Sequence, residues 1–384
     1  MSVSISGDGA LTGIDQGLNV VGVLTASGGF SGNLTGTVNS SGVTTVTTLN
    51  ATSIVGVTTA GITTAYIGSV NDGPISGARN RIINGSFDIW QRGTSGSSGY
   101  LADRWLAEST TSISRSTDVP VGLGVSFRYS IEFSNTSATY PLVLQRIESV
   151  NCYDLVGKTV TISYWAKNIS GAAKIYSELN YANSVDNFTV STVVGNDYST
   201  ATSNPSSSWT YYRTTYTNLP SGVTNGLDIR IVRDNASSAT TRVTGVQLEV
   251  GPTATPFERR SYGQELALCQ RYYETGTIPV NGLAAQYSAN VYTGSNPGFG
   301  CVPIPFVVTK RATPSISSST GSSYWVVAGS FAVTAQASHT FITPGVTQNT
   351  VRFVSNRVAG NSAPDAGRIY MWEENFTWTA AAEL

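Results

Sequence analysis

The sequence predicts an all-β protein with an N-terminal intertwined β-shaft, an antiparallel jelly-roll β-sandwich and a small C-terminal β domain, with one short connecting helix. Charged residues make up only 12% of the 384 residues, against about 25% in average soluble proteins. Ser, Thr, Asn and Gly take their place, which suits strands with a hydroxyl-rich surface. Beyond residue 80, segments of alternating apolar and polar residues recur between Gly, Asn, Ser and Pro clusters, a pattern typical of short antiparallel strands.

Residues 1–78 form the predicted shaft. They contain no Lys, Arg or His, and short units that begin with Gly and end with Thr recur along them, as at 22–25, 32–35 and 42–45. β-Branched residues favour an extended backbone, and Gly permits tight turns. One such chain cannot bury its narrow apolar stripe, but several copies wound together can. We therefore expect an intertwined shaft, most simply a trimer, with a flexible low-complexity linker as the alternative.

Residues 79–260 carry the clearest strand patterns. Apolar and polar residues alternate at 125–133, and the same period of two recurs at 160–166, 227–231 and 246–250. Roughly nine such segments occur between Arg81 and Val250, and many short strands at this spacing predict a sandwich or jelly roll. The turn sequence at 71–74 marks the boundary before this part.

A connecting helix opens the last part, residues 261–384. Ser261 followed by Gln264 fits a capping box, and apolar residues then recur at helical spacing. We expect a helix over about residues 263–274 that links the sandwich to the last module.

The remainder of this last part is predicted to form a second, smaller β domain. Pro303 and Pro305 restrict their segment to an edge strand or a loop, because proline cannot donate a ladder hydrogen bond. The clearest strand candidates lie at 290–292, 326–333, 350–354 and 368–378.

Composition argues against several functions. The formal net charge is −1, and without a basic patch nucleic acid is not an expected partner. Cys152, Cys269 and Cys301 lie far apart, so they predict neither a disulfide framework nor a zinc site, and we interpret them as buried thiols. No apolar run reaches the roughly 18 residues of a membrane span, and the N-terminus lacks a secretory signal pattern.

Catalytic motifs are also missing from the sequence. The single histidine, His339, lacks the context of a catalytic triad, and no phosphate-binding loop occurs. We therefore predict that the protein is not an enzyme. Glycoside cleavage is the enzymatic alternative, because it needs only two carboxylates about 5–9.5 Å apart. The carboxylates that could serve are Asp103, Glu132, Asp186, Asp197, Asp228, Asp234, Glu373 and Glu374.

Several distinctive motifs follow one another along residues 80–384. They are NRIINGSFDIWQRG at 80–93, YLADRW at 100–105, GKTV at 157–160, SYWAK at 163–167, VQLEVG at 246–251, TPFE at 255–258, ELALCQRYY at 265–273 and WTAAAEL at 378–384. Over residues 80–384 the sequence thus resembles virion fibre proteins of tailed bacteriophages. The Gly-Val-Thr-rich region before it resembles structural proteins of phages that infect marine cyanobacteria.

This resemblance implies a structural fibre of the virion, most simply a homotrimeric tail fibre. Its N-terminal part would anchor it to a phage tail or capsid protein, and it would assemble in the host cytoplasm. It would attach to host surface glycans or lipopolysaccharide by weak, multivalent, non-catalytic binding. The alternatives are a purely structural capsid-fibre or tail component, and a surface polysaccharide depolymerase.

The opening Asn-Gly-x-Phe-Asp and the closing Val-x-Leu-Glu also resemble carbohydrate-binding jelly-roll modules. Such modules often hold a structural calcium ion near acidic residues at both ends, where Asp88 and Glu249 stand here. The paired Asp that these modules often show before the closing strand is replaced by Thr244 and Gly245. We therefore assign no metal and no other cofactor.

Aromatic side chains are the candidate glycan-binding residues, because an aromatic ring can pack on the apolar face of a pyranose. Tyr211 and Tyr212 follow Trp209 in a predicted strand, so one face of this group is expected to be exposed. Tyr324 and Trp325, where a loop meets a strand in the last module, are the predicted receptor contacts of a distal tip. The tryptophans within the family motifs are interpreted as structural: Trp90, Trp105 and Trp165.

Overall fold

The computed structural model of the protein describes residues 79–122, 124, 126–135, 140–170, 174–199, 206–234, 239–278, 300–318, 324–327, 341–342, 346–355, 368–371 and 376–384. The predicted shaft, the turn at 71–74, the candidate strand at 290–292 and His339 lie outside these residues. Strands dominate the described part, so the predicted all-β fold class is confirmed. No helix among the described residues is long and apolar enough to cross a membrane.

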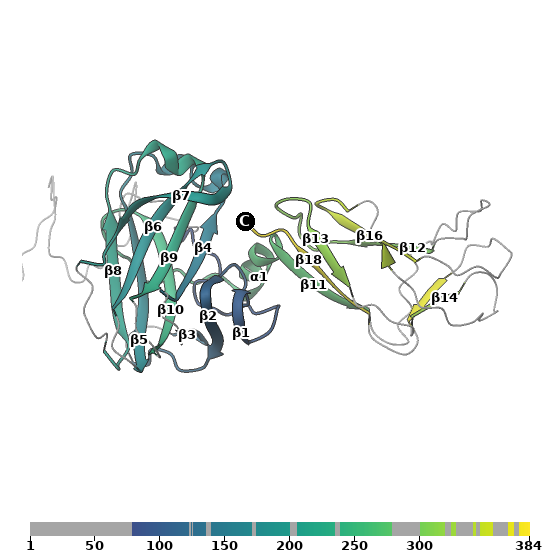
Figure 1. The fold of residues 1–384 in the computed structure, drawn as a ribbon, viewed down its shortest axis with the longest axis horizontal. Helices are drawn as coiled ribbons and strands as arrows, with labels where there is room; N and C mark the ends of the chain where they lie inside the picture. Colours follow the sequence, from purple (N-terminus) through teal and green to yellow (C-terminus); the bar gives the residue numbers. More distant parts are fainter. Residues whose placement is uncertain are drawn as a thin grey trace, which may run out of the picture. The chain divides into compact units, whose positions relative to one another are not determined.

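Strands β1 to β10 form one antiparallel sheet that folds into a sandwich (Figure 1). The strand order is β7-β6-β9-β4-β2-β3-β10-β5-β8, with β1 paired to β2. Strand β2 pairs with β4 through its first residues and with β3 through its last, so it passes from one layer to the other. The bounds are β1 Ser95–Tyr100, β2 Leu106–Ser116, β3 Ser130–Asn135, β4 Leu142–Ile147, β5 Val160–Ser170, β6 Ile175–Ser184, β7 Asn187–Asn196, β8 Thr210–Tyr216, β9 Leu227–Arg233 and β10 Ala239–Val250.

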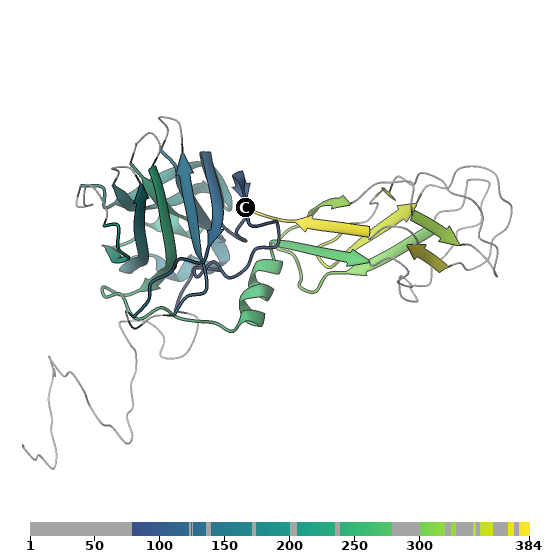
Figure 2. The same ribbon diagram turned by 90° about the horizontal axis from the view of Figure 1, so that it is seen from below.

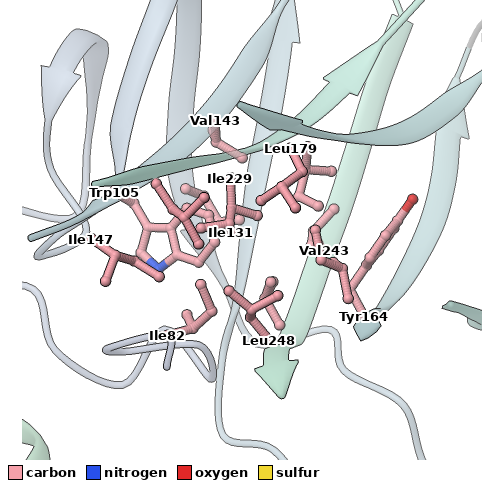
Figure 3. Packing of buried hydrophobic residues seen from close by; sticks show 14 of the residues in the cluster. Ile82, Trp105, Ile131, Val143, Ile147, Tyr164, Leu179, Ile229, Val243 and Leu248 are labelled. Carbon is pink, nitrogen blue, oxygen red and sulfur yellow. The ribbon is translucent and has the colours of Figure 1, made fainter. Parts of the chain in front are cut away.

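Inward-facing side chains fill the space between the two layers. Ile131, Tyr164 and Ile229 are all fully buried, although they come from strands far apart in the sequence. They join the indole ring of Trp105 in one apolar cluster (Figure 3). Apolar burial of this kind is the main favourable contribution to folding. The strands predicted at 160–166, 227–231 and 246–250 are thereby confirmed.

The opening motif forms a tight loop beneath this core. The Asn84 side chain donates to the carbonyl oxygens of Ile89 and Asp103 at 2.9 and 3.0 Å, and it accepts from the Ile89 N–H at 3.0 Å. A Cβ atom at Gly85 would lie 2.1 Å from the carbonyl oxygen of Val246. Only glycine fits there, so this part of the motif holds the loop against the sandwich.

The helix α1 spans Tyr262–Gln270 and begins with the predicted capping box. Ser261 accepts from the Gln264 N–H, and the Gln264 side chain accepts from the Ser261 N–H. The predicted end near residue 274 is wrong, because Tyr273 already belongs to a strand. Three short 3-10 helices lie in the sandwich loops: η1 Ser149–Asn151, η2 Tyr153–Leu155 and η3 Ser221–Asn225.

The described residues of the last part form three small antiparallel sheets. Their strand orders are β11-β18-β13, β12-β16-β15 and β14-β17. Figure 2 shows β18, in yellow, antiparallel to β11. β12 is an edge strand, as its two prolines predicted. The bounds are β11 Tyr273–Ile278, β12 Gly300–Pro305, β13 Ser315–Ser318, β14 Tyr324–Val327, β15 Phe341–Ile342, β16 Thr350–Ser355, β17 Arg368–Met371 and β18 Phe376–Ala381.

Some predicted strands differ in extent from those observed. The segment 326–333 overlaps β14 at 326–327, and its other residues lie outside the described part. The alternating segment 125–133 becomes a strand only at Ser130, and the segment 368–378 contains parts of two strands, β17 and β18. The strand predicted at 350–354 is confirmed as β16.

Ionic contacts join the sandwich to the residues that follow β18. Glu383 pairs with Arg92 at 2.7 Å and with Arg104. The Arg104 guanidinium also lies 3.4 Å from the ring centroid of Tyr272. Because only 1% of the Arg104 side chain is exposed, this cation depends on Glu383 and on the aromatic ring for its stabilisation.

Two of the three cysteines are the buried thiols that the sequence predicted. Cys152 and Cys269 are fully buried and free. Burial raises the pKa of Cys152 to about 12, so its thiol stays protonated and unreactive at neutral pH. The side chain of Cys301 lies outside the described part.

Candidate functional site

Strands β5 and β8 place four aromatic rings in two cross-strand pairs. Trp165 lies opposite Tyr211, and Tyr164 lies opposite Tyr212. Because successive side chains of a strand point to opposite faces, the two pairs lie on opposite sides of the sheet. Tyr164 is fully buried, and its ring stacks on Tyr212 with centroids 5.4 Å apart. The predicted contacts Tyr211 and Tyr212 are therefore separated by the sheet, and Tyr212 faces the core.

The outward pair is half-buried and so partly open to solvent. The ring centroids of Trp165 and Tyr211 lie 5.2 Å apart, with the ring planes tilted by 43°. Trp209, just before β8, is also half-buried. We call Trp165, Trp209 and Tyr211 the aromatic face. A partly exposed pair of this kind offers an apolar platform on the outside of the sandwich.

A charged network adjoins the aromatic face. Asp118 accepts hydrogen bonds from the Trp209 indole N–H at 3.1 Å and from Lys167 at 2.7 Å, and it also pairs with Arg242. Arg242 binds Glu132 at 2.7 Å. Lys167, Arg242 and Glu132 lie in register across β5, β10 and β3, so these charges form one band beside the rings.

Asp118 is the acceptor at the centre of this network. Burial acts to raise its pKa, but the hydrogen bonds from Lys167, Trp209 and Arg242 outweigh that effect and lower the pKa below its ordinary value. The carboxylate is therefore ionised at neutral pH. An ionised carboxylate and an ammonium group beside aromatic rings can bind the hydroxyls of a molecule whose apolar side packs on the rings.

Trp165 was interpreted as structural together with Trp90 and Trp105, but its surroundings differ from theirs. Trp105 is fully buried, and Trp90 packs against the core, where its indole donates to the Phe87 carbonyl at 2.6 Å. Trp165 differs from both because it occupies an outward position of β5. The sequence pattern of residues 160–166 already indicated this outward position, because Trp165 alternates with the apolar residues in the same way as Thr161 and Ser163.

Tyr324 and Trp325 are the first two residues of β14. They pair with Met371 and Tyr370 of β17, so they lie within a strand. Their side chains lie outside the described part, and their role as receptor contacts stays a prediction.

The described carboxylates that glycoside cleavage could use are bound by protein groups. Burial raises the pKa of Asp103 to about 6, and burial also raises the pKa of Asp228 above its ordinary value. Glu373 and Glu374 lie outside the described part. The partners are Gln91 and Arg92 for Asp103, Arg242 for Glu132, Ser149 for Asp186, Ser177 and Thr214 for Asp197, Arg230 for Asp228, and Tyr198 for Asp234.

The acidic residues considered for calcium are bound to protein donors as well. Glu249 accepts from the Thr255 N–H and hydroxyl, both at 2.7 Å, and from Gln247 at 2.8 Å. Asp88 accepts from the Ser86 hydroxyl at 2.8 Å. No group of three or more His, Cys, Asp or Glu side chains in the described ranges could hold a metal ion.

No family model matches the chain, and no curated protein was found to be related to it. Among solved structures, the chain is similar to the enzymatically active domain of tailspike protein 4 from bacteriophage CBA120, with 15% identity and a TM-score of 0.31 over 45% of this chain and 21% of that chain.

Two carbohydrate-binding modules also show similarity. The CBM22-1 xylan-binding domain of Paenibacillus barcinonensis Xyn10C has 13% identity and a TM-score of 0.32 over 48% of this chain and 100% of that chain. The C-terminal family 22 carbohydrate-binding module of Clostridium thermocellum Xyn10B has 15% identity and a TM-score of 0.30 over 43% and 98%. Because these similarities are low, the function has to be argued from the side chains of the sandwich itself.

Proposed function

We propose that the chain is a fibre protein of a tailed-phage virion that binds host-surface glycans without cleaving them. The observation that carries glycan binding is the outward pair of Trp165 and Tyr211, with ring centroids 5.2 Å apart, beside the ionised Asp118. A pyranose would pack its apolar face on these rings, and its hydroxyls would bind Asp118 and Lys167. Glycan recognition combines these two kinds of contact.

The role in a virion is supported by the order of motifs over residues 80–384. In this proposal the N-terminal part anchors the chain to a tail or capsid protein, and the assembled fibre is a homotrimer. One site of this kind binds weakly, but three on one rigid fibre gain avidity through their high effective concentration.

Alanine variants of the aromatic face test the site. We expect Trp165→Ala and Tyr211→Ala each to weaken binding of host glycans by about tenfold, because each removes half of the platform. Tyr153→Ala is the matched control, since Tyr153 is 72% exposed and lies in η2, away from β5 and β8. Binding is measured on immobilised host glycan, and unchanged binding by both variants would reject this site.

Adsorption competition tests the role in attachment. The oligomeric state of the purified protein is first determined by light scattering. The protein is then added to host cells before the phage. Slower phage attachment supports receptor binding, whereas no effect of a folded trimer favours a purely structural fibre. Release of oligosaccharides from host polysaccharide would instead identify a depolymerase.

A further inference from the structure

A pocket of about 170 Å³ lies at the opening loop of the sandwich. The loop contributes Ser86 and Asp88, the segment before β3 contributes Arg128, and residues 257–265 form the remaining wall. The pocket shares no residue with the aromatic face. It is smaller than the roughly 300–1,000 Å³ of sites for drug-sized ligands, so it would hold one small unit.

One wall of the pocket is held rigidly. Arg260 donates to the Ile82 carbonyl at 2.9 Å and pairs with Glu265 at 3.3 Å. The ring of Phe257 packs edge-on against Phe127, with centroids 5.2 Å apart. These contacts fix the wall before any ligand arrives, which lowers the entropic cost of binding.

The opposite side carries groups that are not fully used by the protein. Asp88 Oδ2 accepts from Ser86, but the buried Oδ1 of Asp88 has no hydrogen-bond partner among the described residues. Arg128 is exposed and forms no ion pair with any described residue. Arg259 is 52% exposed; its guanidinium donates to the Ser126 carbonyl at 2.6 Å and approaches Asp88 to 3.7 Å, which leaves further N–H donors for a ligand. A buried acceptor without a donor is costly, so a ligand hydroxyl at this oxygen would be favourable.

The charge and lining of the pocket indicate the class of ligand. Three arginines and two carboxylates line it, which leaves one positive charge in excess. The rings of Phe257 and Tyr262 add an apolar surface, and Tyr262 is 60% exposed. A ligand that carries one carboxylate and a ring with hydroxyl groups would match these arginines, carboxylates and aromatic rings.

We propose that this pocket binds a single acidic sugar, a pyranose that carries a carboxylate. The sugar carboxylate pairs with Arg128 and Arg259, a hydroxyl donates to Asp88 Oδ1, and the ring packs against Phe257 and Tyr262. The site is independent of the aromatic face, and it would add selection for negatively charged glycans.

Ligand-detected NMR on the full chain tests the proposal with glucuronate and galacturonate, and with glucose and galactose as neutral counterparts. We expect only the acidic sugars to bind. Replacing the two exposed arginines of the pocket, in Arg128→Gln/Arg259→Gln, should weaken this binding at least about tenfold. Arg213→Gln, an exposed arginine outside the pocket, is the matched control.

Four results with the wild-type protein and the double variant would overturn the proposal, and a fifth could come from Trp165→Ala. They are equal binding of glucose and glucuronate, no binding of either, equally strong competition by acetate or inorganic phosphate, and unchanged binding by the double variant. The variant Trp165→Ala distinguishes binding in the pocket from binding on the aromatic face. That variant should retain uronate binding even if the face binds no glycan, and loss of uronate binding there would place the acidic sugar on the face instead.

Discussion

Asp103 is a buried carboxyl whose ionisation works against the fold. Its side chain is 1% exposed, and burial raises its pKa to about 6, although Arg92 and the Gln91 N–H act to lower it. The folded pKa thus lies above the ordinary value of 3.8. A group of this kind stabilises the fold fully below its unfolded pKa, and that stabilisation is lost as the pH rises through the folded pKa.

The substitution Asp103→Asn tests this pH dependence. As the pH rises from 4 to 7, we expect the variant to gain about 3 kcal/mol in free energy of unfolding relative to the wild type, since a shift of one pKa unit is about 1.4 kcal/mol. Urea unfolding at a series of pH values measures the difference. Parallel curves for the two proteins would mean that folding does not raise the pKa of Asp103.

The cap of α1 is the clearest test at the level of single elements. Ser261→Ala removes an N-cap side chain and should cost about 1 kcal/mol in free energy of unfolding. Gly263→Ala, one residue into the helix, should act in the opposite direction by up to about 1 kcal/mol, because a Cβ atom there would meet nothing within 4 Å. Chemical denaturation of both variants measures the two signs, and equal effects would count against the capping box.

The strands β5, β9 and β10 were predictable from the local alternation of apolar and polar residues. The segment 125–133 was predictable only in its second half, because its first residues bind elsewhere. Ser126 accepts from Arg259 at 2.6 Å, and Tyr129 accepts from the Thr244 hydroxyl at 2.8 Å. Phe127 packs against Phe257. These tertiary contacts use backbone groups that a longer β3 would need for its ladder hydrogen bonds. The alternation of residues in the sequence does not reveal such contacts.

The end of α1 and the candidate site depended on distant partners in the same way. Tyr273 continues the helical spacing but pairs with Ala381, which lies far along the sequence. Tyr211 was predicted as a contact, whereas its neighbour Trp165 was not, because their register across β5 and β8 is a property of the folded sheet. The pocket beside Asp88 likewise requires loops that meet only after folding.

At the scale of the whole molecule, Glu383 is the residue that links the last strand to the sandwich. Glu383→Gln would leave the buried Arg104 without its counter-ion, and we expect a loss of about 3 kcal/mol in free energy of unfolding. Glu108→Gln is the matched control, since Glu108 is 39% exposed and its pair with Arg146 spans 3.3 Å; such pairs contribute at most about 1 kcal/mol. Similar losses in both variants, measured by urea unfolding, would contradict this role of Glu383.

The position of β18 has a consequence for synthesis on the ribosome. This strand lies between β11 and β13, so both of its neighbours have to wait until residues 376–381 are made. At about 5–20 residues per second, β11 waits on the order of ten seconds. Translation that stops before β18 leaves two strands with open edges, which are prone to pair with other chains. A chain that stops there also lacks Glu383, the counter-ion of Arg104. The truncated chain therefore has open strand edges and a buried arginine without its ion-pair partner.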